Sequence, residues 1–213
     1  MPAAPRTFTA RHVQLTRAAL AAVAAVMITF SPDHSAFIGL SVFGGFAITT
    51  GLVLVLAAIL VHPAGQRWPA ILMGAASLVL GMVGSVPGIR SDGLFFAVVI
   101  AWAAVTGLVE LIAGVRTRGT AGARDAILIG GLGLLLALLL ALVPAGFVQE
   151  SVTAEGATST LTSIIIGVGL FGGYAAIVAV FLAIAGLTPA AKTTTDAGGR
   201  DATSSLADHG GHA

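Results

Sequence analysis

The sequence has 213 residues, of which 57% are hydrophobic and only 9% are charged. Soluble domains carry about 25% charged residues, so this chain has too little charge to cover a globule with a water-compatible surface, and its composition indicates a lipid environment. Lys and Arg total ten and form no basic stripe, which argues against a nucleic-acid partner. The absence of cysteine excludes disulfides, thiolate catalysis and cysteine-ligated metals.

Six apolar stretches follow one another along the chain and predict six transmembrane helices. A helix needs roughly 20 apolar residues, within a range of about 17 to 25, to cross the bilayer core. The stretches cover residues 13–30, 36–61, 68–86, 93–115, 126–143 and 164–187. The predicted fold is therefore an all-α integral membrane bundle over residues 13–187.

The first stretch is the shortest, because Arg17 leaves only residues 18–30 free of charge. Arginines followed by a short apolar run also resemble a signal peptide. The residues from Ser31 to His34 offer no small-x-small cleavage site, however, so we expect an uncleaved helix.

The connections between the stretches carry proline and glycine, which end helices. The longest connection covers residues 144–162 and contains Glu150 and Glu155. Residues 1–12 form a predicted cytoplasmic segment. Residues 188–213 are rich in Thr, Ala, Gly, Ser and Asp, which predicts a disordered tail.

The distribution of Lys and Arg predicts the orientation in the membrane. Nine of the ten basic residues fall on one side of a six-helix topology, and Arg90 alone falls on the other. Cytoplasmic loops carry the excess of Lys and Arg. We therefore expect a multi-pass protein of the cell membrane with both termini in the cytoplasm.

The even-numbered stretches resemble one another, which predicts an internal repeat of three helical hairpins at about 13–61, 68–115 and 126–187. In register, Phe46, Trp102 and Tyr174 coincide, and so do three alanines one residue later. In the odd stretches AILMGA from Ala70 precedes AILIGG from Ala126 by the offset that separates Phe46 from Trp102. Chance similarity among Ala, Gly, Leu and Val is the alternative.

The runs WPAILMGAASLVLGMVGSVP, AWAAVTGLVELIAGVRTR and RDAILIGGLGLLLALLLALVP resemble the HdeD family of small bacterial membrane proteins. The resemblance covers roughly residues 68–144 well and the flanking hairpins more weakly. Its markers are Gly74, Trp102, Gly107, Glu110, Arg116, Gly130 and Pro144. It implies repeated two-helix units and a role in acid resistance and envelope stress, and it supplies no molecular activity.

Glu110 is the candidate site residue, because an ionisable side chain in a membrane helix is costly and marks function or pairing. It lies six residues before Arg116, about 9 Å along a helix. That depth favours a structural ion pair with Arg67, Arg116 or Arg124 near the cytoplasmic face. A proton relay or a ligand contact is the alternative.

Small residues form rows that predict close helix packing in lipid. The predicted packing residues are Ser77, Gly81, Ser85, Gly107, Gly169 and Gly173. We expect this packing to occur within the chain. A bundle of this size encloses little interior, however, so self-association of copies stays open.

No motif of a protease, acyl-transfer enzyme or nucleotide-binding loop is present, and the sequence predicts no catalytic residue and no soluble cofactor. The five histidines lie outside the helix cores without metal-ligand spacing, and a weak metal site at His209 and His212 in the tail is the lesser alternative. The first hypothesis is a non-enzymatic HdeD-type membrane protein. The second is a small transporter or channel-like protein that uses Glu110.

Overall fold

A computed structural model describes residues 9–120, 122–152 and 158–188 of the chain. Within these residues the fold consists of six long helices and one small antiparallel hairpin. The helices are α1 (Ala10–Thr29), α2 (Ala36–Leu60), α3 (Trp68–Ser85), α4 (Asp92–Arg116), α5 (Ala123–Leu142) and α6 (Ser163–Leu187), and two short 3₁₀ turns, η1 (Ala64–Gln66) and η2 (Pro87–Ile89), precede α3 and α4.

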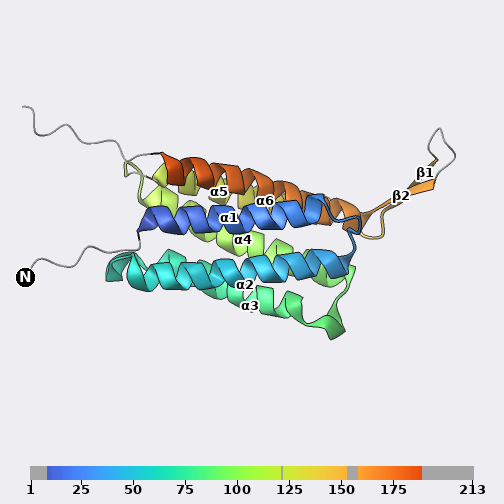
Figure 1. The fold of residues 1–213 in the computed structure, drawn as a ribbon, viewed down its shortest axis with the longest axis horizontal. Helices are drawn as coiled ribbons and strands as arrows, with labels where there is room; N and C mark the ends of the chain where they lie inside the picture. The colour runs from blue at the N-terminus through green and yellow to red at the C-terminus, as the bar shows by residue number, and fades with distance from the viewer. Residues whose placement is uncertain (1–8, 121, 153–157, 189–213) are drawn as a thin grey trace, which may run out of the picture.

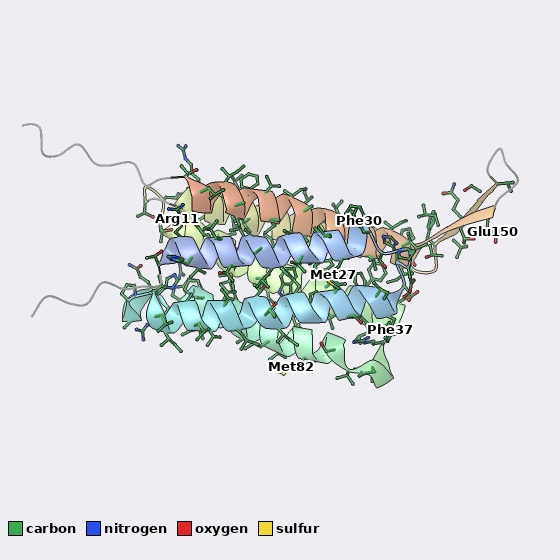
Figure 2. All side chains as sticks on the ribbon, viewed as in Figure 1. Arg11, Met27, Phe30, Phe37, Met82 and Glu150 are labelled. Carbon is green, nitrogen blue, oxygen red and sulfur yellow. The ribbon has the colours of Figure 1, made fainter. Side chains whose placement is uncertain are left out.

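The six helices lie side by side along the long axis of the molecule and form a single bundle (Figure 1). All six are long and apolar enough to cross a membrane, which confirms the predicted fold class and a multi-pass membrane protein. Apolar side chains cover the sides of the bundle along its length (Figure 2), and Met27 and Met82 are each 54% exposed. Such a surface suits lipid and not water.

The even-numbered helices form the centre of the bundle. Each has 25 residues, about 37 Å at 1.5 Å per residue, whereas the odd-numbered helices have 18 to 20. Aromatic rings connect the three central helices: the centroids of Phe46 and Trp102 lie 5.6 Å apart, and those of Trp102 and Tyr174 lie 5.9 Å apart. The three aromatic residues that coincide in the sequence register therefore lie in one cluster.

Each helix packs against its neighbours in the chain, and α6 closes the ring on α1. The most extensive contacts join α2 to α3, α4 to α5 and α6 to α1, rather than the two helices of each predicted hairpin. Glycines allow these close approaches: a Cβ on Gly107 would lie 2.9 Å from the Gly130 carbonyl oxygen, and one on Gly51 would lie 2.9 Å from that of Gly74. The threefold hairpin repeat stays a prediction.

The longest connection contains two strands, β1 (Val148–Val152) and β2 (Thr158–Thr162), which the sequence analysis did not predict. They pair antiparallel, with Glu150 opposite Thr160. β-Branched Val and Thr favour this extended conformation. The hairpin projects beyond one end of the bundle, and Glu150 on it lies far from Arg11 at the opposite end (Figure 2). The amino-terminal segment before Thr9 and the predicted tail after Thr188 lie outside the described residues.

Candidate functional site

Glu110 on α4 forms an ion pair with Arg17 on α1. The Nη1 and Nη2 atoms of Arg17 donate to Oε1 and Oε2 of Glu110 at 3.1 and 3.3 Å. The two side chains are 16% and 12% exposed. Such a bidentate arrangement is the strongest form of this pair, because two parallel hydrogen bonds accompany the charge attraction.

The helix directions explain why these two residues meet. Arg17 is the eighth residue of α1, and Glu110 is six residues before the end of α4. Each therefore lies about 10 Å along its helix from the arginine-rich end. Because α1 starts at this end and α4 finishes there, the two opposite charges lie at the same depth.

The predicted partners of Glu110 were wrong. Nε of Arg67 donates to the carbonyl oxygen of His62 at 2.9 Å, the guanidinium of Arg116 lies 5.4 Å from the centroid of the Trp68 ring, and Arg124 is exposed. From the sequence, Arg17 was an interruption of the first apolar stretch and one of the basic residues of the cytoplasmic side, and it was not among the predicted partners of Glu110. A signal was present, because Arg17 and Glu110 are opposite charges at equal distances from the arginine-rich ends of their helices.

A small cavity lies beside the ion pair, toward the middle of the bundle. Its volume is about 20 Å³, and its polar lining comes from Arg17, Glu110, Thr50, Ser77, Thr106, Trp102 and Tyr174. Trp102 Nε1 donates to Ser77 Oγ at 3.0 Å, and Thr106 Oγ1 donates to the Trp102 carbonyl at 2.7 Å. Thr50 Oγ1 is buried without a partner within the described chain. The cavity has room for one water molecule, which would satisfy this hydroxyl.

A larger cavity opens at the arginine-rich end and reaches the other side of the same ion pair. Its volume is about 390 Å³, within the size range of small-molecule sites. The starts of α1, α3 and α5 and the end of α4 surround it, and its polar lining consists of Gln14, Arg17, His62, Gln66, Glu110, Arg116, Thr117 and Thr120. We call this space the arginine-end cavity.

The opposite half of the interior is apolar. At the level of Trp102, the layer across the three central helices consists of the fully buried Ala47, Ala103 and Ala175, and further from the arginine-rich end it consists of the fully buried Phe43, Val99 and Phe171. Phe95 on α4 is also fully buried there. Polar groups therefore line the interior from the arginine-rich end down to Trp102, and closely packed apolar side chains follow from there towards the other end.

The predicted packing residues divide into two groups. Gly81 contacts Ala47 and Ile48 on α2, Gly107 contacts α5, and Ser77 holds the Trp102 indole. Ser85 Oγ donates to the Gly81 carbonyl at 2.7 Å, and a Cβ on Gly44 of α2 would collide with that hydroxyl oxygen.

Gly169 and Gly173 behave differently, because a Cβ added to either would meet nothing within 4 Å. The expectation of packing within the chain was wrong for these two residues. They line an apolar groove of about 420 Å³ between α5 and α6. The groove exists because large leucine side chains of α5, Leu132 and Leu135 among them, border it instead of small residues.

Arg90, the basic residue predicted to stand alone on the other side, joins helices at that end. Its guanidinium donates to Ser41 Oγ at 2.8 Å and to the Ser85 carbonyl at 3.2 Å, and it lies 4.6 Å from the centroid of the Phe37 ring. The carbonyl contact places a positive charge at the end of α3, where the helix dipole favours it. These contacts indicate that Arg90 has a structural role, in which it joins α2 to α3 at this end of the bundle.

Within the described residues, no group of three or more His, Asp or Glu side chains lies close enough together to hold a metal ion. His209 and His212 lie outside these residues. Comparisons with protein-family models, with curated proteins and with solved structures find no match to this chain. The resemblance to the HdeD family therefore stays a prediction.

Proposed function

We propose that this chain is a non-enzymatic membrane protein of the HdeD type, which contributes to tolerance of acid and envelope stress as a sealed helical bundle. One observation carries the proposal: the bidentate pair of Arg17 and Glu110 is followed, along the bundle, by layers of fully buried apolar side chains. A paired charge in a membrane helix acts as a structural link between helices. The stress role itself comes from the resemblance across residues 68–144.

The test compares cells of the source organism with and without this gene after an acid shock. We expect deletion to reduce survival and the wild-type gene to restore it. We also expect a variant with both Arg17→Met and Glu110→Gln to restore survival, because a structural link can be replaced by an uncharged pair of similar size. Equal survival of deleted and intact cells would contradict the stress role.

A small transporter is the second candidate, and the arginine-end cavity favours it. The cavity reaches a buried charge pair from one end of the bundle, and access from one side to a buried site is what one state of an alternating-access protein requires. Proteoliposomes containing a pH-sensitive dye distinguish the two functions. A sealed bundle leaves proton permeability at the level of empty liposomes. A flux that Glu110→Gln abolishes would favour the transporter.

A further inference from the structure

The arginine-end cavity has an excess of positive charge. Its charged lining consists of Arg17, Glu110 and Arg116, and the only carboxylate among these is neutralised by Arg17. Arg116 forms no ion pair within the described part of the chain and lies against the Trp68 ring. Because the pair of Arg17 and Glu110 is neutral, Arg116 gives the cavity a net charge of about one positive unit.

The first turns of α3 and α5 line the same space with Pro69, Ala70, Ala123 and Ala126. Pro69 has no N–H, and the amides of Ala123 and Ala126 donate to the carbonyl oxygens of Thr120 and Gly122, so the contribution of these turns to anion binding is the positive end of each helix dipole. Asp125 in the first turn of α5 does not line the cavity.

The uncharged lining combines the polar side chains of Gln14, His62, Gln66, Thr117 and Thr120 with an apolar part that suits a hydrocarbon or aromatic body. Val13, Leu54, Ala70, Met73 and Ala113 form the inner walls. A cavity of about 390 Å³ exceeds the volume of an inorganic ion many times over. A ligand that fills it has an anionic head at the Arg116 end and an apolar part that extends toward Met73 and the ion pair.

We propose that the arginine-end cavity binds a small amphiphilic anion, with Arg116 as the group that contacts the anionic head. The same chemistry occurs in a soluble aromatic or aliphatic carboxylate and in the headgroup region of an anionic phospholipid. The guanidinium provides a planar pair of donors for either head, and Trp68 holds it at the cavity mouth. The proposal is independent of a role in stress tolerance.

The test uses the full-length protein in nanodiscs of phosphatidylcholine, with benzoate as the soluble probe. We expect benzoate to raise the melting temperature and to bind with a measurable Kd by calorimetry. Arg116→Gln should weaken binding at least about tenfold, which is typical for loss of a charged hydrogen bond. Arg118→Gln is the matched control, because Arg118 is exposed at the same end but does not line the cavity. It should leave the affinity unchanged.

Nanodiscs of a second lipid composition distinguish a soluble anion from a lipid headgroup as the ligand. In nanodiscs that also contain phosphatidylglycerol, competition that weakens benzoate binding to the wild type assigns the site to a lipid headgroup, and unchanged binding assigns it to a soluble anion. Stabilisation by phosphatidylglycerol alone also supports the lipid assignment if Arg116→Gln abolishes it. Ala126→Phe, which fills the cavity without changing charge, should block either ligand. The proposal is overturned if neither benzoate nor phosphatidylglycerol stabilises the protein, or if Arg116→Gln and Arg118→Gln have equal effects.

Discussion

Arg17 and Glu110 form the only ion pair among the described residues, and each side chain is less than one-fifth exposed. Placing one charge in the hydrocarbon region costs at least about 2.5–3.5 kcal/mol on insertion scales. Pairing in a bidentate geometry offsets much of that cost for both residues. The pair also joins α1 to α4, two helices that are not neighbours in the ring.

We expect Glu110→Gln to destabilise the protein by about 3 kcal/mol, the low end for breaking a buried pair, because the adjoining cavity admits water. The substitution leaves the Arg17 charge without its partner. Adding Arg17→Met should recover much of the loss, which gives a coupling energy of about 1–3 kcal/mol in a double-mutant cycle. Denaturant unfolding in detergent measures these energies.

Arg116→Gln provides the control for this cycle. Its guanidinium lies on Trp68 and makes no hydrogen bond to Glu110 among the described residues, so its effect should add to that of Glu110→Gln within about 0.5 kcal/mol. Equal coupling of Glu110 to Arg116 and to Arg17 would show that the observed pair is not the one that stabilises the protein.

The sequence identified Glu110 because a charge in an apolar stretch stands out locally. It did not identify the partner, since Arg17 is 93 residues away and the contact depends on which helices face each other across the bundle. The hydrogen bond from Trp102 to Ser77 was likewise beyond prediction, although both residues had been noted separately.

At the scale of helices, glycines decide which neighbours pack closely. Gly107 and Gly130 bring the backbones of α4 and α5 into contact, and a Cβ on Gly130 would lie 2.7 Å from the Gly107 carbonyl oxygen. Gly173 on α6 faces open space in the apolar groove. Glycine therefore permits close backbone contact between α4 and α5, whereas on α6 it leaves an open groove.

Gly107→Ala and Gly173→Ala should change the stability of the protein in opposite directions. The first places a methyl group 2.9 Å from backbone atoms of α5, which forces the helices apart at a cost of about 1–3 kcal/mol. The second meets nothing and gains helix propensity, about 1 kcal/mol at most. Melting temperatures in detergent should fall for Gly107→Ala and hold or rise for Gly173→Ala. A matching fall for Gly173→Ala would indicate that another copy occupies the groove.

Helix existence was predictable from apolar length alone, whereas the strands β1 and β2 were not. Residues 144–162 are rich in Ser, Thr, Gly and Ala, a composition that fits an irregular connection as well as a hairpin. The predicted pairing of helices into hairpins stays unconfirmed, because each helix in the ring contacts both the helix before it and the helix after it. The contacts of α2 with α3 are more extensive than those of α1 with α2.

For the whole molecule, the basic residues predict which end faces the cytoplasm. Gln66 lies in η1 at the arginine-rich end and Gln149 lies on β1 at the other, and both are exposed. The chain contains no cysteine, so each Gln→Cys variant carries one thiol. We expect a membrane-impermeant maleimide to label Gln149→Cys in intact cells and to label Gln66→Cys only after lysis. The reverse pattern would invert the topology.

The division of the interior into a half with polar lining and an apolar half gives a further prediction for the whole molecule. Ala70 and Ala47 are both buried, but Ala70 lines the arginine-end cavity whereas Ala47 belongs to the apolar layer. A thiol reacts as its thiolate, which forms only where water reaches it. In inside-out membrane vesicles, Ala70→Cys should therefore react with a small hydrophilic methanethiosulfonate reagent.

Ala47→Cys is the matched variant, with the same substitution at an equally buried position, and it should stay unmodified until the protein is denatured. Mass spectrometry of the intact protein counts the added groups. Reaction of both thiols would mean that water crosses the apolar layer and would favour the transporter. Reaction of neither would mean that the cavity is closed in the membrane, and it would also remove the route by which an anion enters. Reaction at Ala70→Cys alone fits a bundle whose interior is open to water from one side and sealed from the other.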